Sequence, residues 1–369
     1  MATLRSQCCF SKTILNNLLA IERREIWFLI KIFWPQLDIP EESVRVDAYT
    51  TFLDYLKKEL SSFRHFEAHF AAQSFESIGR IVQIIYANPT KIRAELISTT
   101  KEEFINCDED SILRSIELAL RLCLTVNIRS SGVTVGPTPP HHSWGHNLSS
   151  QALLDGAIFQ KSERQLSEKE CRIDQEFTAK YLMHVSGVKI LWIDNLGEHL
   201  RFSHRSRTLK VYQHKICLLH HLNTPNCILP VNLVEETIDT LNLLFPPYDP
   251  PTNKFLCKEK KRFNNLGLCG RDPVTDLRKY SYWRNELYDL IQVFEEPPQQ
   301  WWQLWRYRRN KAEFAQFWIA VLVGIFTMIT IPTSIISAYY TFQQADIARI
   351  QACASESWPQ GLENYCKKR

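Results

Sequence analysis

The stretch FWIAVLVGIFTMITIPTSIISAYY, residues 317–340, decides the architecture of this chain. It lies inside a run, residues 314–345, without any Asp, Glu, Lys, Arg or His, although 23% of the whole chain is charged. About 20 apolar residues in a helix cross the hydrocarbon core of a bilayer, whereas a stretch of about 10 to 14 is typical of a buried helix in a soluble protein. The sequence therefore predicts one transmembrane helix over residues 317–340.

Aromatic side chains flank this run at both ends, as they do where a helix leaves the membrane for water. They are Trp301, Trp302, Trp305 and Trp318 on the N-terminal side and Tyr339 and Tyr340 on the C-terminal side. Pro332 predicts a kink within the helix, which a membrane helix tolerates.

The charges beside the run predict its orientation. Arg306, Arg308, Arg309 and Lys311 precede it, whereas within about twenty residues after it only Arg349 follows. Because Lys and Arg are enriched on the cytoplasmic side, we expect a single-pass protein with a cytoplasmic N-terminal part and an extracytoplasmic tail, residues 341–369. The span comes late in the chain, so the endoplasmic reticulum or another endomembrane is the expected location.

The juxtamembrane segment, residues 301–316, contains the Trp and Arg residues just named together with Lys311. One interpretation is a segment in the headgroup plane that contacts anionic lipid, at about 1 kcal/mol per cation. The other is that these cations only set the topology and require no specific lipid.

Small and polar residues share one face of the predicted span. They are Gly324, Thr327, Thr330, Ser334 and Ser337, three or four positions apart. Such a face predicts self-association through the transmembrane helix. The alternative is that the hydroxyl groups bond to backbone carbonyls of their own helix. The span contains no ionisable residue, which does not favour an ion-coupled transporter.

The remaining chain divides into three parts by composition. Residues 1–129 are predicted to be a helical cytosolic region, because apolar residues such as Leu56 and Leu60 recur every three or four positions. Acidic residues 108–110 are suited to the start of one such helix. Residues 130–150, rich in Gly, Pro and Ser, are predicted to be a linker. Residues 151–300 follow as a cytosolic α+β region.

The α+β region contains a predicted hairpin. Residues 188–193 form an apolar run of strand length, and residues 200–202 and 209–212 flank a basic turn, SHRSR. With the short helix predicted at 177–184, the hairpin resembles a winged-helix arrangement. A net charge of +4 and the membrane anchor do not favour nucleic acid as a partner. The expected fold class is mainly α with this small α+β portion and a single C-terminal transmembrane helix.

Two further helices are predicted before the span. They cover residues 234–245 and 282–294, and each ends at a pair of prolines.

Cysteine and histidine residues suggest two kinds of site. The closest approach to a metal site is the set Cys217, His220, His221 and Cys227, although its spacing matches no standard zinc module and its apolar neighbours indicate a buried segment. We predict neither a metal nor a cofactor. Cys353 and Cys366 would lie in an oxidising lumen, which predicts a disulfide between them.

No standard catalytic motif is present, neither GxSxG nor GxxxxGK[ST], GxGxxG or HExxH. Asp194, Glu198 and His199 are close in sequence and are candidates for acid–base catalysis if they face one cleft. The alternative is that these polar residues only form a turn after the strand.

Four blocks carry a resemblance: KILWIDNLGEHLRF (189–202), ETIDTLNLLFP (236–246), YWRNEL (282–287), and LWRYRRN followed by FWIA (304–320). They resemble a large family of uncharacterised filamentous-fungal (ascomycete) membrane proteins. The resemblance implies a helical N-terminal region, a Trp-containing strand and a C-terminal membrane helix, but no reaction, cofactor or catalytic residue. Tyr307 and Lys311 depart from the family pattern, in which an acidic residue and Pro are common.

These patterns favour a membrane-anchored, non-enzymatic scaffold or regulatory protein whose cytosolic body binds other proteins. The alternative is an accessory protein or anchored enzyme of a fungal secondary-metabolite pathway, with Asp194, Glu198 and His199 as its site. A channel with two C-terminal helices is a third interpretation. The single span and the missing Gly-Met-Asn signature do not favour it.

Overall fold

The computed structural model describes residues 22–130, 141–168, 170–263, 266, 273–296 and 311–354, apart from the side chains of 62–65 and 311–313. The chain forms two compact units, Met1–Pro297 and Pro298–Arg369. In the described residues the first unit is mainly helical with one small sheet, and the second unit is a single long helix. The predicted fold class is therefore confirmed.

The N-terminal part of the first unit is helical. Its helices are α3 (Arg23–Phe33), α4 (Val46–Phe63), α5 (Phe75–Ala87), α6 (Arg93–Lys101) and α7 (Glu109–Leu124), with short 3-10 helices at Glu41–Ser43 and Arg64–His69. The periodic apolar residues of α4 and α7, such as Leu56 and Ile116, are fully buried. The predicted helix start is confirmed, because the Asp108 carboxylate accepts a hydrogen bond from Ser111 N at 3.1 Å as an N-cap.

The predicted linker is described only in its second half, since residues 131–140 lie outside the described residues. Trp144 is fully buried, and its Nε1 donates a hydrogen bond to the Leu148 carbonyl at 2.8 Å. The backbone N–H of His142 donates to the Asn127 carbonyl at 2.9 Å. α8 (Ser150–Ala152) and a π-helical turn, Leu153–Ile158, then continue the chain. The buried residues before and after this segment belong to one continuous core.

A small mixed sheet follows α9 (Ala179–His184). β1 (Lys189–Ile193) pairs in parallel with β3 (Thr208–Tyr212), and β3 pairs antiparallel with β2 (Phe202–Ser203), so the strand order is β1-β3-β2. The predicted hairpin is confirmed as β2 and β3. A 3-10 helix, Leu196–Glu198, lies between β1 and β2. The parallel pairing places the carboxyl ends of β1 and β3 side by side.

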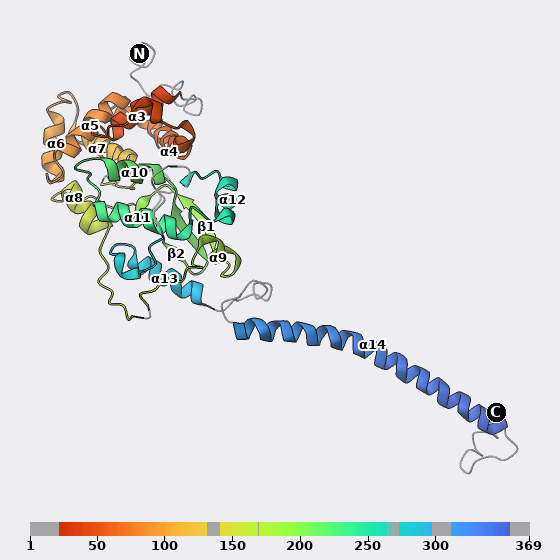
Figure 1. The fold of residues 1–369 in the computed structure, drawn as a ribbon. Coiled ribbons are helices and arrows are strands. Elements are labelled where there is room, and N and C mark those ends of the chain that lie inside the picture. The colour runs from red at the N-terminus through yellow and green to blue at the C-terminus, as the bar shows by residue number, and fades with distance from the viewer. Residues whose placement is uncertain are drawn as a thin grey trace. The chain divides into compact units, whose positions relative to one another are not determined.

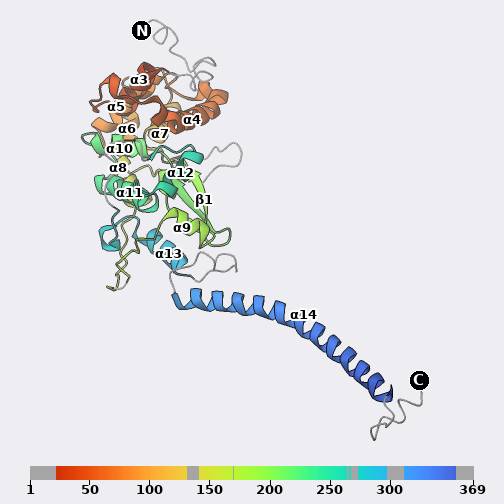
Figure 2. The same cartoon turned by 45° about the vertical axis from the view of Figure 1, so that its right-hand side comes forward.

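The helices after the sheet complete the first unit. They are α10 (Lys215–Asn223), α11 (Val231–Leu244), α12 (Pro250–Lys258), a 3-10 helix at Leu277–Lys279, and α13 (Arg284–Glu295). α11 and α13 confirm the helices predicted over 234–245 and 282–294. Within this unit α3, α5 and α6 lie at one end and α9 and α13 at the other, with α10 and α11 between them (Figures 1 and 2).

A buried carboxylate joins α11 to the start of α13. Glu236 Oε1 accepts a hydrogen bond from Ser281 N at 2.6 Å, and its Oε2 accepts one from Tyr282 N at 2.7 Å. Free N–H groups at a helix start attract a negative charge. The ring of Trp283 contacts the ring of His199 edge to face, with centroids 5.0 Å apart. Three of the four sequence blocks named above therefore pack against one another.

The second unit is represented by α14 (Lys311–Ala354). Its most apolar window has a mean hydropathy of 2.3, and none of that window is buried within the structure. The helix begins earlier and ends later than the predicted span of 317–340, and it continues through Pro332 (Figure 1). By length and composition α14 is able to cross a membrane.

Candidate functional site

Polar residues meet where the two parallel strands end. Asp194 follows β1, and Gln213 and His214 follow β3. α10 then begins at Lys215. In α/β sheets, ligands bind preferentially at the carboxyl ends of parallel strands. A ligand site is therefore expected at this edge of the sheet.

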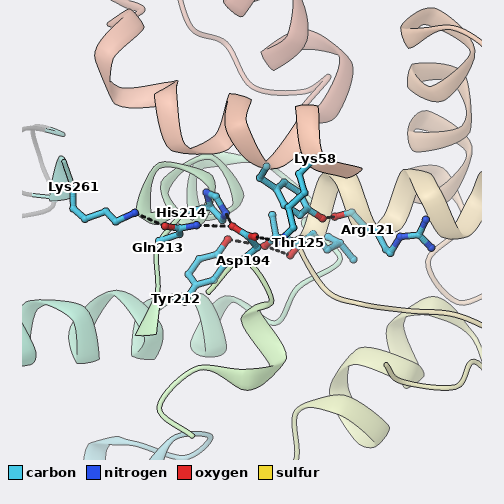
Figure 3. Close-up of polar contacts among 10 residues, drawn as sticks. Lys58, Arg121, Thr125, Asp194, Tyr212, Gln213, His214 and Lys261 are labelled. Atoms are coloured by element: carbon cyan, nitrogen blue, oxygen red, sulfur yellow. Dashed lines mark hydrogen bonds and ion pairs between the residues drawn. The ribbon is translucent and has the colours of Figure 1, made fainter. Parts of the chain in front are cut away.

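Asp194 is the centre of a hydrogen-bonded network (Figure 3). Its Oδ1 accepts hydrogen bonds from His214 Nε2 at 2.9 Å and from Gln213 Nε2 at 2.5 Å. Its Oδ2 accepts one from Lys58 Nζ of α4 at 3.2 Å. Burial on its own raises the pKa of Asp194, but the hydrogen bonds from His214 and Gln213 and the neighbouring positive charges hold that pKa well below its usual range. Asp194 is therefore ionised at neutral pH.

His214 is completely buried beside this carboxylate. Burial lowers the pKa of His214, although Asp194 opposes the effect, so the ring is neutral at pH 7. The neutral ring donates from Nε2 to Asp194, which leaves Nδ1 unprotonated. Among the described residues, Nδ1 has no hydrogen-bond partner. The rings of Tyr55 and Tyr212 contact the imidazole, with centroids 5.4 Å and 5.5 Å away.

Lys261, which follows α12, extends the network. Its Nζ donates a hydrogen bond to Gln213 Oε1 and lies 5.3 Å from the ring centroid of Trp192 in β1. Trp192 Nε1 in turn donates to Glu259 Oε2 at 3.3 Å. Burial lowers the pKa of Lys261, while nearby carboxylates oppose this change. Because Gln213 bonds a cation with its oxygen and a carboxylate with its nitrogen, its amide orientation is fixed.

A small pocket lies beside His214. Thr51 and Phe52 of α4 and Arg262 are among the residues that line it. Its volume is about 10 Å³, which is about the space that one water molecule needs. An imidazole with a carboxylate behind it is suited to accept a proton from a bound molecule. In this conformation the pocket has room for about one water molecule.

The predicted catalytic residues Asp194, Glu198 and His199 have different partners. Glu198 forms ion pairs with Lys210 at 3.0 Å and with Arg201 at 3.6 Å, rather than with the network around Asp194. Its carboxylate therefore stabilises the hairpin.

His199 is fully buried. Its Nδ1 accepts a hydrogen bond from Tyr212 N at 3.2 Å, and its Nε2 donates one to Thr240 Oγ1 at 2.8 Å. Burial lowers the pKa of His199 to about 3, so the ring is neutral. The partner of Asp194 is His214, which the sequence analysis missed. His214 carries the same signal as Asp194, a polar residue soon after an apolar strand.

The predicted metal candidates lie in and after α10 and are Cys217, His220, His221 and Cys227. His220 Nε2 is 2.7 Å from the Tyr49 hydroxyl and shares a hydrogen bond with it. Burial lowers the pKa of His220 to about 3 and raises the pKa of Cys217. No group of three or more His, Cys, Asp or Glu side chains in the described part of the chain is arranged to hold a metal ion.

His221 connects α10 to two N-terminal helices. Its Nδ1 accepts a hydrogen bond from Trp34 Nε1 at 3.2 Å, and its Nε2 donates one to the Cys123 carbonyl at 3.1 Å. Cys227 Sγ lies 3.4 Å from the same Nδ1. Burial lowers the pKa of His221 to about 4. Both ring nitrogens are therefore used in bonds that hold the core together.

The polar residues of α14 bond to their own helix. Thr327 Oγ1 donates to the Val323 carbonyl at 2.7 Å, and Thr330 Oγ1 donates to the Thr327 carbonyl at 3.2 Å. Ser334 Oγ donates to the Thr330 carbonyl at 2.7 Å. A Cβ added at Gly324 would meet no atom within 4 Å. These bonds agree with the second interpretation of the polar face, and the predicted self-association is not tested by them.

The other predicted membrane residues are described only in part. Trp318, Ser337, Tyr339 and Tyr340 lie on α14, and Lys311 is its first residue. Trp301, Trp302, Trp305, Arg306, Arg308, Arg309 and Cys366 lie outside the described residues. Cys353 is disulfide-bonded, and its pairing with Cys366 stays a prediction. A gel shift on reduction that Cys366→Ser abolishes would support the pairing.

The sequence blocks 189–202, 236–246 and 282–287 meet around Glu236, Trp283 and His199, so the residues that carry the resemblance also form part of the core. Asp194, the centre of the hydrogen-bonded network, lies near the middle of the first block. Comparison of the chain with protein-family models, with curated proteins and with solved structures finds no match.

Proposed function

We propose that this chain is a single-pass membrane protein that holds its folded unit, Met1–Pro297, at the cytoplasmic face of a membrane and acts there as a non-enzymatic scaffold or regulator. The observation that carries the proposal is α14, whose most apolar window has a mean hydropathy of 2.3 and is not buried. A helix satisfies its own backbone hydrogen bonds and is stable in lipid, whereas so long an apolar surface is unfavourable in water. The cations before the helix support the cytoplasmic placement.

The buried histidines of the first unit support a non-enzymatic role. His199, His220 and His221 use their ring nitrogens in bonds that join distant helices and strands. The pocket beside His214 has a volume of only about 10 Å³. A role in binding other molecules through its surface agrees with these two observations.

The membrane topology tests the first part of the proposal. Asn147 is exposed and begins a glycosylation sequon, Asn147-Leu148-Ser149. The full chain would be expressed with a second sequon fused after Arg369 and treated with endoglycosidase. We expect a mass shift from the added sequon and no further shift with Asn147→Gln. Glycosylation at Asn147 would show that the orientation is the opposite of the proposed one. Release of the protein by alkaline carbonate would contradict membrane insertion.

Proximity labelling tests the scaffold role. A labelling enzyme would be fused to the N-terminus of the full chain, and the control would carry an unrelated soluble domain in place of Met1–Pro297 on the same α14. We expect the full chain to label a reproducible set of cytosolic proteins that the control does not label. Identical labelling by both proteins would contradict the proposal.

A second candidate function is an accessory protein or anchored enzyme of a fungal secondary-metabolite pathway. The observation that favours an enzyme is the pair Asp194–His214, in which a buried imidazole has an unprotonated Nδ1 beside a pocket. Deletion of the gene followed by metabolite profiling tests it. A product that is lost on deletion, restored by the wild-type chain and not restored by an equally abundant His214→Gln protein would support an enzyme. Full restoration by His214→Gln would exclude this site.

A further inference from the structure

The outer face of the β1-β3-β2 sheet is exposed and basic. Successive side chains of a strand point to opposite faces. Leu209 and Val211 of β3 are fully buried, whereas Lys189 and Leu191 of β1 are exposed on the opposite face, where Leu191 is paired in register with Lys210. Leu191 is 47% exposed, so one apolar side chain lies among the cations of this face.

The hairpin adds further cations to this face. Arg201 precedes β2, and Arg205 lies at the exposed turn between β2 and β3. Lys189 and Arg205 form no ion pair with any described residue. We call the surface made by Lys189, Leu191, Arg201, Arg205 and Lys210 the basic sheet face.

Carboxylates neutralise only part of this charge. Glu198 pairs with both Arg201 and Lys210, and Glu296 pairs with Arg207 at 3.1 Å. Glu295 is the remaining acidic residue at the end of α13. The cations of the strand and hairpin outnumber these three carboxylates. Lys189 and Arg205, which pair with no carboxylate in the described part of the chain, are available to bind an external anion.

The basic sheet face lies near the point where the folded unit leads to the membrane helix. β2 contacts α13, the last helix before the connection, and the turn residue Arg207 pairs with Glu296 directly after that helix. Figure 1 shows α9, β2 and α13 at the same end of this unit, and Figure 2 shows α9 and α13 there. Residues 297–310 then connect to α14, and a chain of that length reaches at most about 50 Å.

We propose that the basic sheet face binds anionic lipid headgroups of the membrane that α14 anchors. The inference rests on the proposed membrane insertion. Each cation near an anionic surface strengthens its binding by about fivefold. Leu191 between Lys189 and Lys210 gives the face an apolar residue that can enter the interface, and the tether raises the local concentration of lipid. A nucleic acid fits less well, because the whole chain has a net charge of only +4.

The experiment compares the full chain in nanodiscs of phosphatidylcholine alone with nanodiscs in which about one lipid in three is phosphatidylserine. Hydrogen exchange of the backbone amides of residues 202–208 is the readout. We expect at least about threefold slower exchange in the anionic nanodiscs, and a loss of this protection in high salt. The double variant Lys189→Glu/Arg205→Glu should abolish it. The control Arg24→Glu/Arg80→Glu changes the same charge at exposed positions on α3 and α5 and should keep it.

Two failures are distinguishable. A chain that does not enter nanodiscs contradicts the proposed membrane insertion itself. A chain that enters them but shows the same exchange of residues 202–208 in both lipid compositions overturns the lipid-binding inference alone. Protection by added RNA and not by phosphatidylserine would also overturn it, in favour of a nucleic-acid surface.

Discussion

His214 Nε2 donates a hydrogen bond of 2.9 Å to Asp194 Oδ1 and so joins the residues that follow two parallel strands. The two residues are 20 positions apart and meet because β3 lies directly beside β1. Lys58 of α4 binds the second carboxylate oxygen. The network thereby connects the N-terminal helices to the sheet.

Replacement of Asp194 by Asn should destabilise the folded unit by about 1 to 3 kcal/mol. The amide lacks the negative charge that pairs with Lys58, and only one of its two terminal atoms accepts hydrogen bonds. Chemical unfolding of the full chain in detergent measures the change. Asp38→Asn, at an exposed position, is the control and should remain within about 0.5 kcal/mol of the wild type. Equal stability of the two variants would show that the network does not stabilise the fold.

Replacement of Glu236 by Gln should lower the free energy of unfolding by about 2 to 3 kcal/mol. Both carboxylate oxygens accept backbone hydrogen bonds, one from Ser281 N and the other from Tyr282 N. In Gln one of these oxygens is replaced by an NH₂ group, which cannot accept, so one backbone N–H group loses its acceptor. The same unfolding measurement applies, with the exposed Glu103→Gln as control. If both variants unfold at the same denaturant concentration, the buried carboxylate is not required to hold the start of α13.

Lower pH should destabilise the folded unit through its buried histidines. Burial lowers the pKa of His199 and His220 to about 3 and of His221 to about 4, from 6.5. Between pH 6.5 and these values the unfolded chain binds more protons than the folded one, so stability falls as the pH falls and does not change on their account above pH 6.5. At pH 5 each of these three histidines lowers the free energy of unfolding by about 2 kcal/mol relative to its value at pH 7.

The measurement for this prediction is the free energy of unfolding at pH 7 and at pH 5. His220→Gln removes one of the three groups and should reduce the loss between the two pH values. His141→Gln, at an exposed position, should leave the loss unchanged. A pH dependence that is identical in all three proteins would contradict the assignment.

Gly324→Leu should weaken self-association of the membrane helix if the small and polar face is its interface. In the isolated helix a side chain at Gly324 has open space, so the substitution should not disturb the helix itself. Crosslinking of the full chain in membranes is the measurement. Ile325→Leu is the control, because Ile325 lies about 100° or more around the helix from each residue of the small and polar face. A dimer that persists unchanged with Gly324→Leu shows that this face is not the interface.

Local sequence signals predicted the N-terminal helices, α9, α11, α13 and the hairpin, but neither α10 nor α12. Asp108 caps α7 as expected, and the apolar period of α4 is buried. Such signals depend on residues within a few positions of each other, so they are readable without the fold. The candidate site was predicted only in part, because Asp194 was recognised and His214 was not. Which strands pair in parallel depends on the packing of the whole unit.

The sequence by itself determined that residues 314–345 carry no charge, and with it the presence of one helix able to cross a membrane. Only the tertiary structure decided what the histidines do. His220 meets Tyr49 and His221 meets Trp34 across 171 and 187 positions of the chain. The physical reason is that a hydrophobic run acts through its own length, whereas a buried polar ring needs a partner that the folded core alone brings within hydrogen-bond distance.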